Sequence, residues 1–314
     1  MRSASESEAS SRSAVRAFTT AVIARETLKD VATLLGERGI PVMPLKGVLF
    51  QLLLYPDPAA RRLCDVDVLV PEARFAEAIE VLVQHGYRPA SAGPSWIEAA
   101  LESPRGLPVD LHRRVFCALR YRMPTHEQFA RATLDEQQLG VALHLQHPLD
   151  SLAHLVGKFV SDHVHAEATA RLAEIERLVA HYALEPGAAA RHLERCGLGR
   201  AARHVFSRAA REREHEFHAA LLAELPGGVM TAAVVELAGR LARRFEHGPL
   251  APLSAHLLNT SLWRGACSLL LAVAYTGEHA RLRRAGGKRG GYWAPFFSAA
   301  SRSARRRASS ARPV

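Results

Sequence analysis

The sequence has few aromatic residues, few cysteines and no long hydrophobic run. Aromatic residues make up 6% of the 314 positions while Ala and Leu are abundant, so we expect a largely helical protein. The four cysteines lie far apart, with no pair at zinc-site spacing, and nothing in their positions suggests a disulfide scaffold. No secretory signal precedes the first helical pattern, and the longest apolar run, 267–275, is too short to span a bilayer. We therefore expect a soluble, reduced, cytoplasmic protein without a membrane partner.

Acidic residues are missing from the C-terminal end. Residues 281–314 hold ten of the 41 Lys and Arg and no Asp or Glu, so the remainder holds 31 basic and 31 acidic residues. The formal charge of +10 therefore belongs to this tail. Nucleic acid is an expected partner only through residues 281–314, by phosphate contacts and by stacking on the tail's aromatic side chains. The alternative is a disordered end that keeps the protein soluble.

Hydrophobic periodicity divides the chain into four parts. Residues 1–12 are rich in Ser and Glu and are predicted to be disordered. Residues 13–147 mix helical patterns with strand patterns, the latter at 40–45, 66–70, 87–90 and 107–115, while 91–106 is predicted to be irregular or to contain a short helix. Residues 148–280 show only helical periodicity, and 281–314 is the basic tail. We predict an α/β (α+β) fold, with a small mixed sheet and flanking helices followed by an all-helical domain.

Two aspartates interrupt a run that otherwise reads as a buried strand. Asp65 and Asp67 are two residues apart, so a strand places both carboxylates on one face, where a cation is expected between them. Asp110 interrupts a second strand pattern. Three carboxylates on neighbouring strands are typical of a site that holds two Mg²⁺ ions for phosphoryl transfer. The alternatives are a solvated strand end for the pair, and an ion pair with Arg113 or Arg114 for Asp110.

A second group of residues has the chemistry of a phosphate site. Lys46 and Gly47 stand where a strand pattern meets a helix pattern, and a helix start offers free N–H groups to an anion that Gly allows to approach. Arg61 can add a forked donor to the same anion. Lys46 could instead be an ordinary lysine at a helix start. His112 follows Asp110 on the same strand face, and either orients a carboxylate or is a polar residue at a strand edge.

The order of these motifs resembles a known family. The series Leu-Lys-Gly, Arg-x-x-x-Asp-x-Asp-x-Leu-Val, Gly-Tyr and Val-Asp-Leu-His, within about residues 20–180, is similar to the uncharacterised nucleotidyltransferase family of the polymerase-β-like superfamily. The residues that match its pattern are Lys46, Gly47, Arg61, Asp65, Asp67, Leu69, Val70, Asp110 and His112. The superfamily's usual Gly-Ser phosphate-binding pair is absent, and Lys46-Gly47 stands in its position.

The resemblance implies an enzyme that moves a nucleotide. It implies Mg²⁺-dependent transfer of an NMP from an NTP to a hydroxyl acceptor, with release of pyrophosphate. The three aspartates would be catalytic and would bind the metals, and Lys46, Gly47 and Arg61 would bind the nucleotide. The acceptor is open between a small molecule, a peptide or protein, and RNA. Two other functions stay open, namely a nucleotide- or metal-binding regulatory module of the same fold and an RNA-associated protein that acts through its tail.

Overall fold

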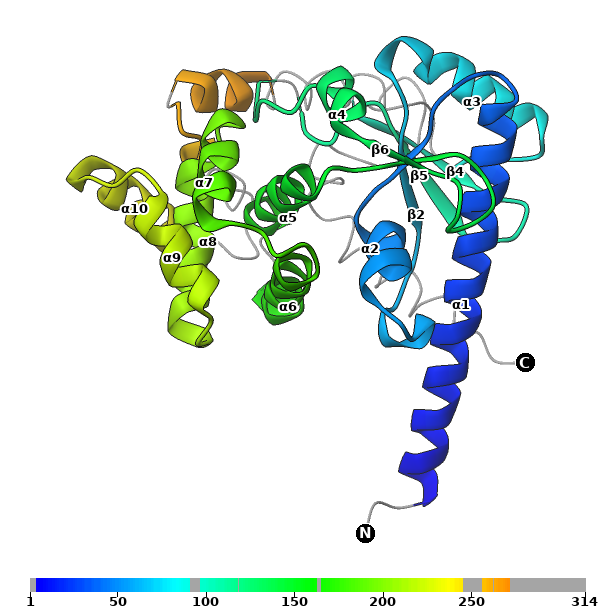
Figure 1. Ribbon diagram of the computed structural model, residues 1–314, viewed down its shortest axis with the longest axis horizontal. Coiled ribbons are helices and arrows are strands. Elements are labelled where there is room, and N and C mark those ends of the chain that lie inside the picture. The colour runs from blue at the N-terminus through cyan, green and yellow to red at the C-terminus, as the bar shows by residue number, and fades with distance from the viewer. Residues whose placement is uncertain are drawn as a thin grey trace. The chain divides into compact units, whose positions relative to one another are not determined.

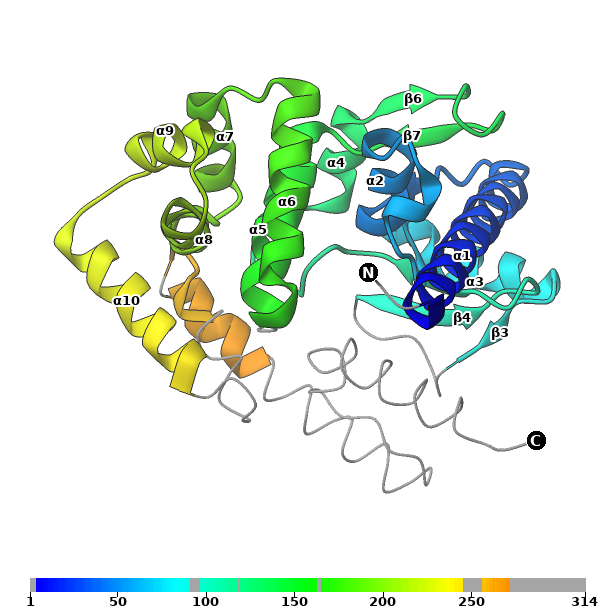
Figure 2. The same ribbon diagram turned by 90° about the horizontal axis from the view of Figure 1, so that it is seen from below.

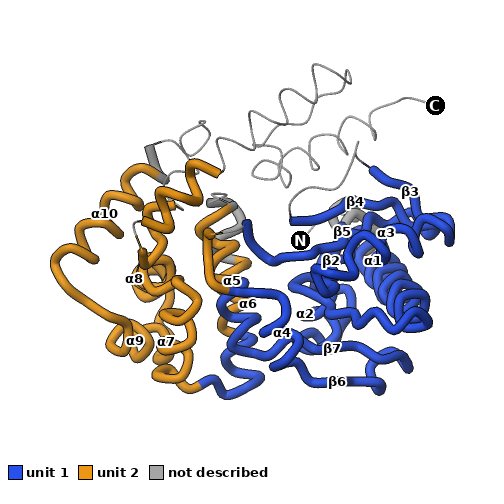
Figure 3. The backbone as a smooth tube through the Cα atoms, turned by 90° about the horizontal axis from the view of Figure 1, so that it is seen from above, with its two compact units in different colours: residues 1–117, 123–154, 177–184 blue, residues 118–122, 155–176, 185–314 orange. Residues whose placement is uncertain are grey.

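The computed structural model describes residues 4–90, 97–117, 119–162, 165–244, 256–261 and 263–271. The chain forms two compact units (Figure 3), of which unit 1 comprises residues 1–117, 123–154 and 177–184, and unit 2 comprises residues 118–122, 155–176 and 185–314. The main division falls at residue 154, a few residues after the boundary at 147 that the sequence predicts. The tail 281–314 lies outside the described residues, so both of its interpretations stay predictions.

The strands belong to the first half of the chain and the second half is helical (Figure 1). The helices are α1 Ala4–Gly36, α2 Lys46–Leu54, α3 Phe75–Gln84, α4 Thr125–Arg131, α5 Pro148–Asp162, α6 His165–Tyr182, α7 Pro186–Arg195, α8 Gly199–Glu212, α9 Glu216–Glu224 and α10 Val229–Arg244. The strands are β1 Met43–Pro44, β2 Val66–Leu69, β3 Arg88–Pro89, β4 Glu98–Glu102, β5 Pro108–His112, β6 Thr133–Asp135 and β7 Leu143–Leu145. This arrangement confirms the predicted α/β class.

One sheet forms the centre of unit 1. Its strands lie in the order β1-β2-β5-β4-β3, with β2 and β5 parallel and the other pairs antiparallel. Strand β4 falls within 91–106, where the sequence analysis expects irregular structure or a short helix, and that expectation is wrong. Ala and Glu favour helix locally, but pairing of all five β4 residues with β5 overrides this preference.

Helices α1 and α3 lie side by side on one face of the sheet (Figures 1 and 2). On α1 the buried residues are spaced by three and four, which is the apolar stripe of a helix that packs on a core. They include Ala17, Ala21, Ala24, Leu28, Val31 and Leu35, and Thr27 and Ala32 are buried beside them. Helix α1 begins at Ala4, so residues 4–12 are helical where the sequence analysis predicts disorder. Ala and Glu in this stretch favour continuation of the helix that follows.

The turn after α3 depends on a glycine. Gly86 has a φ of +88°, a left-handed conformation that an L side chain rarely adopts. The N–H groups of Gly86 and Tyr87 donate to the carbonyls of Val83 and Leu82, which satisfies the end of the helix. The chain then reverses into β3. In the sequence, a helical pattern over residues 72–85 that ends at Gly86 predicts both this helix and its stop.

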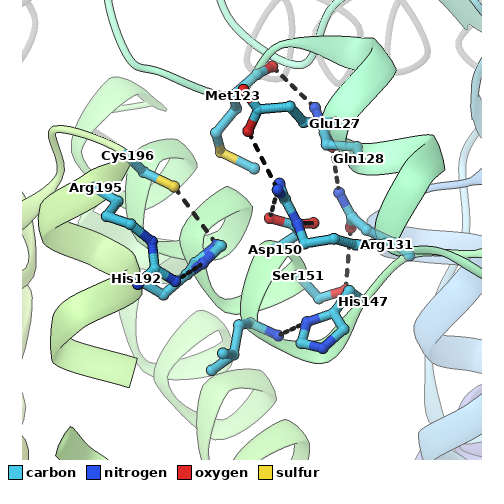
Figure 4. A network of polar contacts seen from close by, with 12 residues as sticks. Met123, Glu127, Gln128, Arg131, His147, Asp150, Ser151, His192, Arg195 and Cys196 are labelled. Atoms are coloured by element: carbon cyan, nitrogen blue, oxygen red, sulfur yellow. Dashed lines mark hydrogen bonds and ion pairs between the residues drawn. The ribbon is translucent and has the colours of Figure 1, made fainter. Parts of the chain in front are cut away.

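Buried polar contacts join α4 to the first turn of α5 within unit 1 (Figure 4). The Arg131 guanidinium donates from Nε and Nη2 to the two oxygens of Asp150, at 3.0 Å each, and Asp150 is fully buried. Beside this pair, Gln146 donates to Gln128 at 2.9 Å and accepts from the Ser151 hydroxyl at 3.0 Å. A paired guanidinium offsets the cost of burying the carboxylate. These contacts hold the first turn of α5 against α4 within unit 1.

Unit 2 has a helical core. The largest contributions come from α7, α8 and α9, where Leu193, Val205, Phe206 and Leu221 are fully buried. On α7, His192 Nε2 lies 3.5 Å from the sulfur of Cys196, and both side chains are buried (Figure 4). No helix among the described residues is both long and apolar enough to cross a membrane.

Candidate active site

The two faces of the sheet differ in chemistry. Strand β2 places Asp67 directly beside Asp110 of β5 and Leu69 beside His112. Directly paired residues of parallel strands point to the same face. The alternate residues of both strands are Val66, Val68, Val109 and Leu111, and they belong to the hydrophobic core beneath α1 and α3. Asp67, Asp110 and His112 therefore share the opposite face, where their exposed fractions are 8%, 3% and 4%.

The structure brings two of the predicted aspartates, Asp67 and Asp110, side by side on this face. Strands β2 and β5 are neighbours, as the sequence predicts, and Asp65 immediately precedes β2, half-buried, two residues before Asp67. Within the described ranges, however, no three His, Cys, Asp or Glu side chains stand in an arrangement ready to hold a metal ion. The oxygen donors suit Mg²⁺ in kind. The metal site itself stays a prediction.

Asp67 accepts two contacts on a single oxygen. Lys46 Nζ lies 3.3 Å from Asp67 Oδ1, and His112 Nε2 lies 2.9 Å from the same atom. Lys46 therefore supplies a cation to Asp67, and His112 contacts the same carboxylate. Whether His112 orients that carboxylate stays a prediction. Near Asp110, Arg114 pairs with Glu72 at 2.7 Å, and Arg113 lies over the ring of Phe75.

Lys46 has an unusual backbone conformation. Its φ is +38°, so a side chain with a Cβ stands in the left-handed region at the first residue of α2. The preceding residue is fixed to the sheet, because the Leu45 N–H donates to the Asp67 carbonyl at 2.9 Å. A non-glycine residue in this region costs on the order of 1–3 kcal/mol, and such residues gather at functional sites. The strained junction points the lysine at Asp67.

Gly47 and Arg61 lie together at the start of α2. A Cβ added to Gly47 would come within 3.1 Å of Arg61 Nη1 and 3.3 Å of Leu63 Cδ2. The absence of a side chain therefore lets the guanidinium approach the helix start. Lys46, Gly47 and Arg61, predicted as a group, are brought together by the structure, and all three stand beside the strand that carries Asp67.

Glu98 is a site residue that the sequence analysis missed. It pairs with His112 in the β4–β5 register, and its Oε2 lies 3.3 Å from His112 Nδ1. The residue falls in the stretch predicted to be irregular or helical. The usable signal was the alternation of Ile97, Ala99 and Leu101 with polar or small residues, because a period of two is typical of a strand.

This face belongs to the α/β unit of the chain, and comparison with known families gives its class. Residues 8–211 match the model of a family described as uncharacterised nucleotidyltransferase. The match covers about two thirds of the chain, and the protein belongs to this family. The resemblance carried by its motifs is thereby confirmed. No curated protein matches the chain.

Several solved structures share parts of the arrangement at low identity. A nucleotidyltransferase-like antigenic protein from Paracoccidioides brasiliensis is 16% identical, covering 65% of this chain and 94% of its own, with a TM-score of 0.45. The enzyme ANT(2")-Ia, solved with adenylyl-2"-tobramycin, is 12% identical and covers 54% of this chain and 93% of its own, with a TM-score of 0.39. The Thermotoga maritima CCA-adding enzyme, solved with tRNA, is 12% identical over 80% of this chain and 82% of its own, with a TM-score of 0.26. Likenesses at this level indicate no substrate for the present protein.

Proposed function

We propose that this protein transfers an NMP from an NTP to a hydroxyl acceptor and releases pyrophosphate, with Mg²⁺ as cofactor. The observation that carries the proposal is the β2–β5 register, which sets Asp67 beside Asp110 on the polar face of the sheet, next to Lys46. Membership of a nucleotidyltransferase family supports the reaction class. The base of the NTP and the acceptor are left open.

The residues of this face have distinct roles in the proposed reaction. Asp65, Asp67 and Asp110 would hold Mg²⁺, which would stabilise the negative charge on the reacting phosphoryl group. Asp110 also accepts the proton of the acceptor hydroxyl, while the hydroxyl oxygen forms a bond to the α-phosphorus of the NTP. The bond between the α- and β-phosphates breaks, and pyrophosphate leaves. Catalysis by this arrangement consists mostly of positioning and charge stabilisation.

The other half of the site would hold the triphosphate. Arg61 and Lys46 supply cations near Gly47, at the start of α2, where backbone N–H groups and the helix dipole favour an anion. Lys46 contacts Asp67 in the structure, and it would exchange that partner for a phosphate when nucleotide and metal bind together. Lysine therefore performs here what a hydroxyl does in a Gly-Ser pair.

The test is label transfer. The protein is incubated with Mg²⁺ and each α-³²P-labelled NTP, alone and with a host lysate, and pyrophosphate release and the labelled product are measured. We expect one NTP to support transfer. Asp67→Asn should abolish it, while Glu102→Gln, on the same strand face as Glu98 but exposed and paired with Arg88, should leave it intact. Equal activity in Asp67→Asn and wild type contradicts the proposal.

One observation favours a second candidate, a nucleotide- or metal-binding regulatory module without turnover. The Lys46–Asp67 contact already provides the carboxylate with a cation, as a structural ion pair would. Such a module binds nucleotide but releases no pyrophosphate under any acceptor condition. Calorimetry with Mg²⁺ and NTP, run beside the transfer assay, separates the two functions.

A further inference from the structure

His112 lies between two carboxylates on the polar face of the sheet. Its Nε2 is 2.9 Å from Asp67 Oδ1, and its Nδ1 is 3.3 Å from Glu98 Oε2. The three residues come from three consecutive strands of the sheet, β2, β5 and β4. The His112 side chain is 6% exposed, whereas that of Glu98 is 30% exposed. The His112 imidazole therefore stands between the half-buried carboxylate of Glu98 and the buried carboxylate of Asp67.

The direction of the central hydrogen bond follows from the chemistry of its partners. An ionised carboxylate can only accept, so the His112 Nε2 must carry the proton that Asp67 Oδ1 accepts. Lys46 donates to the same oxygen. With two donors on one oxygen, the Asp67 carboxylate cannot turn freely about its last torsion. On the opposite side of the ring, Glu98 Oε2 lies 3.3 Å from Nδ1 without a hydrogen bond, and the Glu98 side chain limits the space in which the imidazole can turn.

We propose that His112, held in place by Glu98, is a positioning residue that fixes the orientation in which Asp67 meets the metal–nucleotide complex. This inference rests on the proposed function. Groups that orient a metal ligand in this way change metal affinity without touching the ion, typically by about 10–100-fold when removed. His112 is buried, and its effect is transmitted entirely through Asp67. Glu98 acts one step further away and has a smaller effect.

Four variants separate positioning from a structural role. His112→Leu fills the space without a donor, and His112→Gln offers an amide N–H in place of Nε2–H. Glu98→Ala removes the restraint on the ring. Glu102→Ala is the matched control, because it removes a carboxylate from the same strand and face, at a position paired with Pro108 and not with His112.

The readout is Mn²⁺ affinity, measured by electron paramagnetic resonance with each of the four α,β-methylene NTPs, together with the melting temperature. We expect His112→Leu to weaken Mn²⁺ binding about 10–100-fold, His112→Gln to recover most of it, and Glu98→Ala to weaken it less. The double variant His112→Leu/Glu98→Ala should be no weaker than His112→Leu alone, because both substitutions act through the same contact. Glu102→Ala should match wild type.

The outcomes also distinguish this inference from the proposed function. Wild-type protein that binds no Mn²⁺ with any nucleotide overturns both. Normal Mn²⁺ binding in His112→Leu, or a lowered melting temperature with unchanged affinity, overturns the positioning role alone. Additive losses in the double variant would overturn the link between Glu98 and His112. If His112→Leu does not fold, His112→Gln and Glu98→Ala still test the proposal. An equal Mn²⁺ affinity in Glu98→Ala and wild type would show that Glu98 has no part in positioning His112.

Discussion

At the scale of single residues, Asp67 is at the centre of the polar contacts on this face of the sheet. A buried carboxylate is costly unless it is paired and hydrogen-bonded, and Asp67 meets this need through Lys46 and His112. Both partners reach it from other elements, the start of α2 and the end of β5. A residue that depends on two donors can also exchange one of them. We infer that Lys46 is the donor that changes partner, because it stands at the strained strand-to-helix junction.

Substitution of Lys46 tests this inference. Lys46→Ala and Lys46→Gly both remove the cation, and each should weaken triphosphate binding or slow transfer roughly tenfold to 150-fold, equivalent to about 1.5–3 kcal/mol. Their stabilities should differ, because glycine relieves the left-handed strain and alanine does not, by about 1 kcal/mol.

Nucleotide titration and chemical unfolding of the two variants provide the measurements. If both variants bind NTP normally but lose stability, Lys46 is a structural partner of Asp67. If the alanine variant is as stable as the glycine variant, the left-handed backbone at Lys46 carries no strain. Lys29→Ala on α1 is a control for the loss of a lysine charge away from the site.

At the scale of elements, the joint between α4 and α5 depends on one asymmetric ion pair. Asp150 is fully buried, but about a third of the Arg131 side chain is exposed, and Arg131 also contacts Glu127 at 3.2 Å. Removal of the arginine leaves the buried carboxylate without its guanidinium. Removal of the acid leaves an arginine that reaches water and a second acid. The two substitutions should therefore lower the free energy of unfolding by different amounts, although they break the same ion pair.

We expect Arg131→Met to lower the free energy of unfolding by about 3–5 kcal/mol, and Asp150→Asn to lower it by clearly less. Urea unfolding at pH 7 measures both changes. Arg240→Met, in the exposed Arg240–Glu236 pair of α10, is the matched control and should change stability by no more than about 0.5 kcal/mol. Equal losses in the two pair variants would contradict the argument from burial.

A second element-scale prediction concerns α9 in unit 2. Burial lowers the pKa of His218 to about 4, with smaller contributions from His215 and Arg213. The unfolded state binds a proton near pH 6.5 and the folded state does not, so stability is full above pH 6.5 and falls as the pH drops towards 4. The loss should be roughly 1 kcal/mol per pH unit within this window.

Denaturant unfolding at pH 7, 6 and 5 measures the effect. In His218→Gln the free energy of unfolding should fall less steeply between pH 6.5 and 4 than in wild type. In His126→Gln, which changes an exposed histidine of α4, the fall should be the same as in wild type. If the pH dependence of stability is unchanged in His218→Gln, then His218 does not cause the loss of stability at low pH.

At the scale of the whole molecule, the charge is distributed very unevenly. All of the formal net charge of +10 lies in residues 281–314, and the remaining chain is balanced. Folding and nucleotide chemistry should therefore be independent of the tail. Any electrostatic binding of nucleic acid should require it, since such binding depends on the number of phosphates that the protein neutralises.

Truncation after residue 280 should leave the melting temperature and any transfer activity unchanged. It should remove salt-sensitive binding of single-stranded RNA, measured by fluorescence anisotropy at 50 and 200 mM salt. Replacement of the ten tail cations by glutamine in the full-length chain is the companion variant. A large fall in melting temperature on truncation, with none in the glutamine variant, would show that the tail packs on the body through its apolar residues.

The sequence alone was sufficient for several features of this protein. The spacing of Asp65 and Asp67 within an apolar strand predicted a polar face, because strand alternation is a local property. The motif order, from Lys46 to His112, predicted the family. The helical half and the glycine stop after α3 followed from periodicity and backbone preference, which are also set by nearby residues.

Other features were decided only by tertiary structure. Strand β4 formed where local preference favoured helix, because β5 offered it a full set of backbone partners, and this placed Glu98 beside His112. The β2–β5 register joined Asp67 to Asp110 across 42 intervening positions in the chain. Lys46 became the partner of Asp67 because the left-handed turn at the start of α2 directs it there. Contacts between residues far apart in the chain depend on how strands pair, and no local pattern encodes that pairing.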